Sequence, residues 1–357
     1  MSHLLLVINP GSTSTKIAVF SGEEPVLEQT LRHTAEELKG YGRIIDQYQF
    51  RMEIILAFLQ KAGFDLGTLS AVVGRGGILK PIVGGTYLVN DLMVRDLTDG
   101  VQGEHASNLG GIIAREIADK LGLPAYIVDP VAVDELSPHA RISGLPEIER
   151  RSIWHALNQK AVVRRAAAEL GLDYEKANFI GVHLGGGISV AAHEKGRAVD
   201  VNNALHGDGP FSPERAGGLP VGDLVGLCYS GKYTQGEIGK KLAGQGGLVA
   251  YLGLNDGRAI QARIEAGDER ARLVYEAMAY QIAKEIGSAA AVLKGGVEAI
   301  VLSGGLANDR AYLVPWIVER VSFIAPVKVY PGEFEMLALA QGGLRVLDSR
   351  EEAREYR

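Results

Sequence analysis

Residues 4–20 read LLLVINPGSTSTKIAVF. Two short apolar runs enclose a polar turn with Pro and Gly, a pattern that predicts two buried strands joined as a hairpin. A strand follows the turn and the stretch is not GxxxxGK[ST], so a P-loop NTPase is disfavoured. Hydroxyls, backbone N–H groups and an ammonium at a strand end suit a nucleotide phosphate, whereas an ordinary solvated turn uses the same residue types. The candidate phosphate-binding side chains are those of Asn9, Ser12, Thr13, Ser14 and Lys16.

Length and composition restrict the class of protein. A chain of 357 residues is long enough for two domains, because one hydrophobic core rarely grows beyond roughly 250–300 residues. The formal net charge of −6 argues against nucleic-acid binding, which needs a basic face. The single cysteine, Cys228, allows no internal disulfide, and its apolar neighbours predict a core position. Because we find no secretory leader and no apolar run of bilayer length, we expect a cytoplasmic protein that does not contact membranes.

Two later segments repeat the plan of the first. Residues 178–193 show an apolar strand, a glycine turn and a second apolar strand, with His183 just before three glycines. A third strand leads into the Gly-Gly turn at 304–305, and Asn308 follows as a helix-capping residue type. The first two hairpins begin about half a chain length apart, which suggests two similar halves facing each other across a cleft.

Helical patterns alternate with these strands. Amphipathic stretches predict helices over residues 48–63, 109–121, 154–170, 270–293 and 333–347, and further strands are predicted at 72–73, 125–128 and 327–330. This alternation indicates an α/β protein. The charged tail, residues 348–357, is expected to be a solvated helix end.

Several single residues have positions that favour chemistry. Arg75 lies between glycines at a strand end, where a guanidinium can pair with a carboxylate or phosphate in two parallel hydrogen bonds. Asp129 follows a predicted strand directly, a position suited to a ligand or to a turn cap. His155 lies at a helix start, which favours a neutral ring or a nearby anion. Arg215 lies in a dense polar loop. Glu335 lies in the first turn of the last predicted helix, where a carboxylate also complements the helix dipole.

Together these segments resemble the acetokinase family of acetate and butyrate kinases, within the superfamily of sugar kinases, heat-shock ATPases and actin. The resemblance spans nearly the whole chain. It implies two similar α/β domains of actin-like, ribonuclease H-like fold, with mixed sheets flanked by helices and a cleft between the domains. The first domain would comprise residues 1–150, completed by 333–357, and residues 151–332 would form a nucleotide-binding and dimerisation domain. A homodimer or higher homo-oligomer follows from the same resemblance.

The resemblance also implies roles for individual residues. Arg75 matches the substrate-site arginine, Asp129 the catalytic aspartate and His155 the transition-state histidine. Asn9 and Glu335 match positions associated with Mg²⁺, which accompanies ATP or ADP. The implied nucleotide- and phosphate-binding residues are Asn9, Ser12, Thr13, Ser14, Lys16, His183, Gly185, Gly186, Gly187, Gly304, Gly305 and Asn308.

Departures from the acetate kinase pattern favour the butyrate kinase branch. The first motif reads NPGSTSTK instead of NxGSSSxK, and the arginine segment is the compact VVGRGG. No GTR[SC]G stretch is present, so Arg215 is our candidate for the second active-site arginine. The branch implies the reaction butanoate + ATP ⇌ butanoyl phosphate + ADP. Phosphorylation of 2-methylpropanoate, propanoate or acetate is the first alternative, and a sugar kinase or a non-enzymatic ATP-dependent clamp or repressor is a more distant one.

Overall fold

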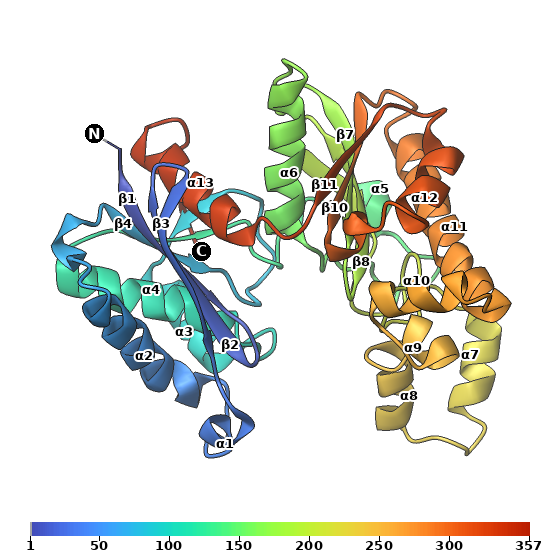
Figure 1. The fold of residues 1–357 in the computed structure, drawn as a ribbon, viewed down its shortest axis with the longest axis horizontal. Coiled ribbons are helices and arrows are strands. Elements are labelled where there is room, and N and C mark those ends of the chain that lie inside the picture. The colour runs from blue at the N-terminus through green and yellow to red at the C-terminus, as the bar shows by residue number, and fades with distance from the viewer. Residues whose placement is uncertain (1) are drawn as a thin grey trace. The chain divides into compact units, whose positions relative to one another are not determined.

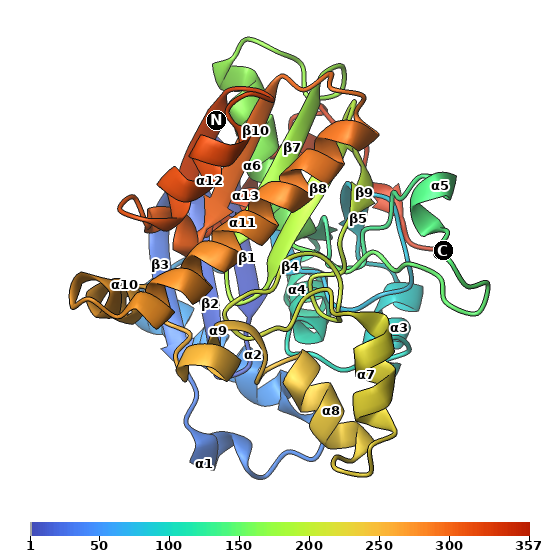
Figure 2. The same cartoon turned by 90° about the vertical axis from the view of Figure 1, so that its right-hand side faces the viewer.

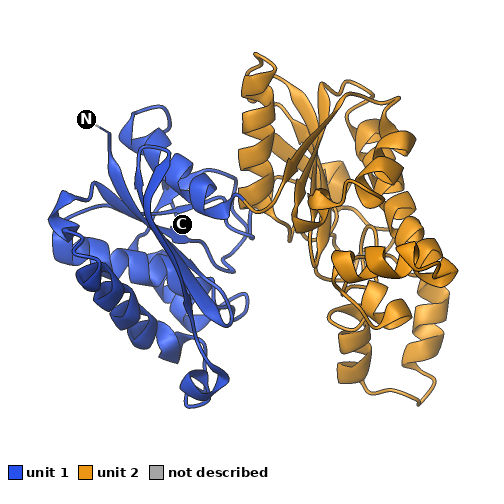
Figure 3. Cartoon of the chain, in the orientation of Figure 1, with its two compact units in different colours: residues 1–133, 334–357 blue, residues 134–333 orange. Residues whose placement is uncertain are grey.

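The computed structural model describes residues 2–357 and divides the chain into two compact units. Unit 1 comprises the chain up to residue 133 together with residues 334–357, and unit 2 comprises residues 134–333 (Figure 3). The C-terminal segment therefore packs with the N-terminal half of the chain. The division lies at residues 133/134, whereas the sequence placed it at residue 150.

Unit 1 is built on a seven-stranded mixed sheet (Figure 1). Its strand order is β12-β5-β6-β4-β1-β2-β3. In chain order the strands are β1 (Leu4–Pro10), β2 (Ser14–Ser21), β3 (Glu24–Arg32), β4 (Ala71–Arg75), β5 (Thr86–Leu88), β6 (Ala125–Val128) and β12 (Arg354–Glu355). Strands β1, β2 and β3 form an antiparallel meander, and β1 pairs in parallel with β4, which pairs in parallel with β6. The predicted hairpin over residues 4–20 is thus confirmed.

Helices cover both faces of this sheet. They are α2 (Tyr48–Lys61), α3 (Asp91–Asp99), α4 (Asn108–Leu121) and α13 (Glu335–Leu347). The short helix α1 (Ala35–Leu38) has no buried residue. Helix α4 packs against Gly74, where an added Cβ would lie 2.1 Å from the Gly110 carbonyl oxygen. The neighbouring Val73 side chain meets Gly343 of α13 on the opposite face, since side chains alternate along a strand. Helices α4 and α13 therefore cover opposite faces of the sheet.

Unit 2 has a five-stranded mixed sheet in the order β11-β10-β7-β8-β9. The strands are β7 (Asn178–Leu184), β8 (Ile188–Glu194), β9 (Arg197–Val201), β10 (Ala299–Gly304) and β11 (Val327–Pro331). Strands β7, β8 and β9 form an antiparallel meander, and β7 pairs in parallel with β10. This is the arrangement of β1, β2, β3 and β4 in unit 1. The prediction of two similar α/β halves with mixed sheets is confirmed.

Long helices flank the second sheet as well. The helices of unit 2 are α5 (Pro138–Arg141), α6 (Ala156–Glu169), α7 (Val221–Cys228), α8 (Gln235–Leu242), α9 (Gly247–Leu252), α10 (Gly257–Glu265), α11 (Glu269–Val292) and α12 (Leu313–Val321). Figure 2 shows α11 crossing the face of β7 and β8. Ile180, Val182 and Leu184 of β7 join the apolar core beneath α11. The alternate residues of β7 face α6, on the other side of the sheet.

Two predictions about single segments were wrong. The tail after α13 is not a solvated helix end, because Arg354 and Glu355 pair in parallel with β5 and the Tyr356 side chain is buried. The Tyr356 hydroxyl donates to Asp96 Oδ2 at 2.7 Å, which anchors the tail on α3. Cys228 is exposed at the end of α7 instead of lying in the core. None of the helices in residues 2–357 is both long and apolar enough to cross a bilayer.

Candidate functional site

A buried arginine donates hydrogen bonds to the backbone of the first hairpin turn. Arg51 of α2 is fully buried, and its Nη1 donates to the carbonyl oxygens of Gly11 at 2.8 Å and Ser14 at 3.1 Å. Its Nη2 donates to the Ser12 carbonyl at 3.0 Å. Burial lowers the pKa of Arg51, yet a guanidinium stays charged in proteins. The predicted phosphate-binding turn therefore lies on a fixed positive charge, which favours an anion there.

Sequence reasoning missed Arg51 because it lies on a different element from the turn, in the helix predicted over residues 48–63. The Thr15 hydroxyl adds a second buried contact to this support, since it lies 2.9 Å from Nε2 of His33. His33 is a neighbour of Arg51, and burial followed by the charge of Arg51 lowers the pKa of His33. The turn thus rests on a buried polar layer and not on apolar packing alone.

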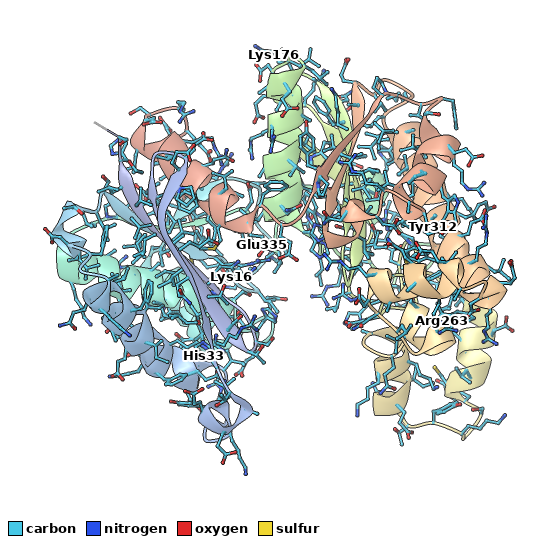
Figure 4. The ribbon with its side chains drawn as sticks, in the orientation of Figure 1. Lys16, His33, Lys176, Arg263, Tyr312 and Glu335 are labelled. Carbon is cyan, nitrogen blue, oxygen red and sulfur yellow. The ribbon has the colours of Figure 1, made fainter. Side chains whose placement is uncertain are left out.

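Three predicted site residues meet beside this turn. Arg75 at the end of β4 forms an ion pair with Glu335 at the start of α13. Asn9 of β1 connects the two, because its Nδ2 donates to Glu335 Oε2 at 2.8 Å and its Oδ1 accepts from Arg75 Nη1 at 3.4 Å. Asn9 is also the register partner of Lys16 on β2. Figure 4 labels Lys16 on β2 and Glu335 at the start of α13.

Two of the three side chains are partly exposed, whereas Asn9 is buried. The Arg75 and Glu335 side chains are 19% and 17% exposed. An ion pair in such a position is weakly screened by salt, and its guanidinium can still reach a bound anion. The cluster therefore combines a cation for a carboxylate or phosphate with hard oxygen atoms for a metal ion.

Asp129 lies at the same edge of the sheet. It follows Val128, which is the register partner of Arg75 in the parallel β4–β6 pair. Its carboxylate is buried and accepts the Gly85 backbone N–H at 2.7 Å. The backbone of Asp129 has φ of +38°, a conformation that is costly for a residue with a side chain and recurs at functional sites. Asp129 thus ties the segment before β5 to the sheet edge next to Arg75.

Asn9 and Glu335 were predicted to hold Mg²⁺, and their donor atoms fit this ion. An amide oxygen and a carboxylate are the hard ligands that Mg²⁺ prefers, and the ion usually completes its shell with waters and substrate phosphates. Across residues 2–357 no group of three or more His, Cys, Asp or Glu side chains gathers as a metal cage. The donor set therefore suits an ion that arrives with a nucleotide.

In unit 2, His155 and His183 lie against each other. Their rings are stacked, with centroids 3.9 Å apart and planes 14° from parallel. His155 is the N-cap residue of α6, as the sequence predicted, and His183 is in β7 just before the glycine turn. Nδ1 of His183 lies 3.1 Å from Asn158 Oδ1, and Asn158 Oδ1 also accepts from the Ser303 hydroxyl at 2.8 Å. The helix start at His155 and the strand that carries His183 were predicted separately, and the structure brings them into direct contact.

Arg215 lies directly beneath the second glycine turn. Its Nη1 donates to the Ala204 carbonyl, and a Cβ added at Gly187 would lie 1.7 Å from this Nη1. Residue 187 must therefore be glycine for the guanidinium to occupy this place. Burial lowers the pKa of Arg215, and the Glu214 carboxylate opposes this shift. The structure brings together Arg215 and the turn at Gly185–Gly187, which the sequence had assigned to phosphate binding.

A pocket of about 560 Å³ opens beside this turn within unit 2. Its volume lies in the range of small-molecule sites. The predicted nucleotide-binding residues that line it are Gly185, Gly186, Gly305 and Asn308. The other lining residues are Pro213, Asn255, Asp256, Gly257, Arg258, Gln261, Tyr275, Leu306, Asp309 and Glu333. His183, Gly187 and Gly304 are on the same strand ends and turns as the lining glycines.

Sequence reasoning missed the wall formed by Asn255, Asp256, Arg258 and Gln261. These residues surround the start of α10, where the Asp256 side chain caps the helix by accepting the Arg258 N–H at 2.9 Å. An Asp followed by Gly at a helix start is a readable capping signal, although it does not reveal which cavity the helix faces. The pocket floor is fixed by Tyr275, whose hydroxyl donates to Asp309 Oδ2 at 2.9 Å.

Comparison with known proteins gives the family. The sequence model of the acetokinase family matches residues 147–333, which is more than half of the chain. The chain belongs to the acetokinase family. Butyrate kinase 2 of Clostridium acetobutylicum is 58% identical over 357 residues, with 100% of both chains covered. The family resemblance inferred from the sequence is therefore confirmed.

Solved structures of similar proteins confirm the fold of this acetokinase-family chain. Porphyromonas gingivalis acetate kinase superposes with a TM-score of 0.79 at 21% identity, covering 97% of this chain and 100% of that chain. A propionate kinase from Francisella tularensis gives a TM-score of 0.75 at 19% identity, covering 95% and 98% of the two chains. At these identities the likeness establishes the shared architecture.

Proposed function

We propose that this acetokinase-family protein is an ATP-dependent carboxylate kinase that catalyses butanoate + ATP ⇌ butanoyl phosphate + ADP. The observation that carries the proposal is the contact of Arg75, Asn9 and Glu335 beside the turn of the first hairpin. In the proposed site, Arg75 would be the cation for the carboxylate, and Asn9 and Glu335 would be the oxygen ligands for a magnesium nucleotide. Butanoate is the proposed acid because the similar Clostridium protein is named a butyrate kinase.

The nucleotide is proposed to bind unit 2. The pocket of about 560 Å³ would take the adenosine between the turn at 304–305 and the start of α10. The phosphates would then lie along the glycine turn at 185–187, with His183 at its base. In unit 1 the hairpin turn, including Lys16, would contact the transferring phosphoryl group, because its buried Arg51 favours an anion there.

The chemistry needs charge neutralisation more than a base. A carboxylate is already ionised near neutral pH, so one of its oxygens can attack the γ-phosphorus directly. A P–O bond forms to the acid, the P–O bond to ADP breaks, and ADP leaves with the electron pair. Arg75 would orient the carboxylate, and His155 and Arg215 would stabilise the equatorial phosphoryl oxygens. Asp129 would hold the edge of the sheet that presents Arg75.

Asn9 and Glu335 would hold Mg²⁺, directly or through its waters. When bound, the ion would neutralise charge on the nucleotide phosphates. The ion pair with Glu335 meanwhile keeps Arg75 next to the place where the acid would bind.

We also propose that the protein forms a homodimer or higher homo-oligomer through unit 2. Helix α7 exposes apolar side chains, with Val221 at 72% and Val225 at 51% exposure, and Tyr229 follows at 88%. Contiguous exposed apolar residues are typical of protein interfaces. A cytoplasmic location stays a prediction from the sequence.

A coupled assay of ADP release tests the proposed activity. Initial rates should be measured with ATP and Mg²⁺ over straight-chain and branched acids of two to six carbons, with hexoses as the comparison. Butanoate should give the highest kcat/KM among the straight-chain acids, and hexoses should give no ADP above the blank. A preference for 2-methylpropanoate, propanoate or acetate would reassign the acid within the same reaction. Turnover with hexoses alone would overturn the proposal in favour of a sugar kinase.

A further inference from the structure

Nδ1 of His155 is held by a buried serine. It lies 2.9 Å from the hydroxyl oxygen of Ser189, and Ser189 is 0% exposed. Ser189 is on β8, directly opposite His183 in the β7–β8 ladder, so its side chain lies beside the ring that stacks on His155. A buried hydroxyl needs an acceptor for its hydrogen, and the identity of that acceptor decides where the proton on His155 lies.

Gln159 settles the direction of this hydrogen bond. It follows His155 by one helical turn on α6, and its Nε2 donates to the Ser189 carbonyl oxygen at 3.0 Å. A carbonyl oxygen only accepts, so the amide nitrogen of Gln159 must face Ser189. The same Nε2 lies 2.7 Å from the Ser189 hydroxyl oxygen and donates to it. The hydroxyl therefore accepts from Gln159, and its own hydrogen is directed to Nδ1 of His155.

The other end of Gln159 is fixed as well. Its Oε1 accepts from Nε2 of His193 at 3.3 Å, and Nδ1 of His193 lies 2.9 Å from the Tyr174 hydroxyl. Burial holds the pKa of His193 well below its usual value, so the ring carries one proton, on Nε2. Its Nδ1 then accepts the Tyr174 hydrogen. Every donor in this series points the same way, from Tyr174 toward His155.

A glycine leaves room for the hydrogen bond between His193 and Gln159. An added Cβ at Gly181 of β7 would lie 2.5 Å from Gln159 Oε1 and 2.7 Å from Nε2 of His193. Both contacts are shorter than real side chains tolerate, and the atoms concerned are the two that form the hydrogen bond. Residue 181 thus has to lack a side chain for the series to be continuous, which is a second observation independent of the hydrogen bonds themselves.

We propose that Tyr174, His193, Gln159 and Ser189 form a directional hydrogen-bond relay that fixes His155 as the neutral tautomer protonated on Nε2. In the imidazolium, or in the tautomer protonated on Nδ1, the Ser189 hydroxyl would lose its acceptor inside the protein, which is costly. The four residues are positioning residues. The consequence for catalysis rests on the proposed function: His155 would present Nε2–H, a neutral donor of set orientation, to a phosphoryl oxygen.

Nuclear magnetic resonance of the full-length protein labelled with nitrogen-15 in its histidine rings tests this assignment without any assay of activity. Correlations between ring nitrogens and carbon-bound protons distinguish the two neutral tautomers and the imidazolium, and a His155→Gln variant identifies the His155 signals. We expect the Nε2–H form for His155 near neutral pH. An Nδ1–H form or an imidazolium in the unmodified protein would overturn the proposal even if no variant folds.

Matched variants test the relay itself. Ser189→Ala removes the donor to Nδ1 and Gly181→Ala breaks the link between Gln159 and His193, so both should yield a mixture of tautomers at His155. Ser303→Ala is the control. Ser303 is as buried as Ser189, but its hydroxyl donates to Asn158, which contacts the His183 ring. This variant should leave the His155 tautomer unchanged. An unchanged His155 signal in folded Ser189→Ala would contradict the relay.

Steady-state kinetics then separates the relay from the proposed function. Ser189→Ala should lower kcat about tenfold while the KM for ATP changes less than about twofold, because only the orientation of a transition-state donor is lost. If the tautomer behaves as expected and the unmodified protein phosphorylates no carboxylate, the relay stands and the proposed function fails.

Discussion

Arg75, the last residue of β4, forms an ion pair with Glu335, the first residue of α13. The pair joins the strand at the middle of the unit 1 sheet to the segment by which the chain returns to that unit. Asn9 bonds to both partners. A guanidinium held in this way needs little reorganisation to receive an anion, which is the property that electrostatic catalysis requires.

Arg75→Ala should lower kcat on the order of 10²–10³-fold, as expected for the loss of one charge-stabilising donor. The reason is that both the carboxylate and the transferring phosphoryl group lose their cation. The measurement is the initial rate of ADP release with saturating butanoate and ATP. Arg43→Ala is a matched control, because Arg43 is exposed and pairs with Glu104 far from the hairpin turn in sequence. Near-normal turnover of Arg75→Ala would remove Arg75 from the site.

Glu335→Gln should raise the Mg²⁺ concentration needed for half-maximal rate by about tenfold or more, the size of effect seen when the environment of a metal is perturbed. The variant keeps the shape of the side chain and removes the charge that Asn9 and Arg75 contact. A titration of Mg²⁺ at fixed ATP measures this. Glu28→Gln on the exposed strand β3 is the control. An identical Mg²⁺ dependence in the two variants would argue against a metal role for Glu335.

Arg51→Met should lower the free energy of unfolding by about 3 kcal/mol or more, because each buried carbonyl left without a donor costs about 1–3 kcal/mol. The Gly11 and Ser12 carbonyls lose the Arg51 donor in this variant, whereas the Ser14 carbonyl keeps the Gly11 N–H at 2.7 Å. Urea denaturation followed by circular dichroism gives the value. Lys120→Met, at an exposed ion pair with Glu116, should change stability by less than about 1 kcal/mol. Equal stability of the two variants would show that Arg51 does not support the turn.

The stability of unit 2 should depend on pH through His193. Burial, followed by the charges of Lys160 and Arg164, holds the pKa of this ring well below its usual value. The unfolded chain binds a proton near pH 6.5 and the folded chain does not, so this contribution to stability is complete above about pH 6.5 and is lost as pH falls through the native pKa.

Urea denaturation at about pH 7.5 and about pH 5.5 checks this dependence on pH. His193→Gln removes the titrating group, so the variant should lose less stability between the two pH values than the unmodified protein loses. The opposite ordering, or an equal loss in both proteins, would mean that His193 is not a neutral buried ring in the native state.

The local sequence pattern was sufficient to predict the pairing of strands that follow each other directly in the sequence. The hairpin over residues 4–20 and the one around His183 follow from two apolar runs on either side of a glycine turn, and the structure shows both. The contact of Asn9 with Glu335 could not be derived in this way, because it depends on the return of α13 to the first sheet. Only the family resemblance assigned these two residues to one ion.

Predictions failed or were missing where the position of a residue depends on contacts with elements distant in the sequence. The charged tail contains Tyr356, whose burial depends on Asp96 of α3, and nothing in the tail itself indicates that partner. Cys228 lies in an apolar run, yet an apolar run cannot distinguish a core strand from an exposed apolar helix. Gln159 and Ser189 carry no motif, and their role emerges only when α6 packs on β8.

Phosphorus NMR of the reaction products tests the central claim most directly. The protein is incubated with butanoate, ATP and Mg²⁺, and the spectrum is followed for an acyl phosphate resonance that hydroxylamine removes. The account predicts that butanoyl phosphate and ADP accumulate in equal amounts and that Arg75→Ala forms neither at a comparable rate. Release of inorganic phosphate without any acyl phosphate, or no reaction of butanoate and related acids, would contradict it.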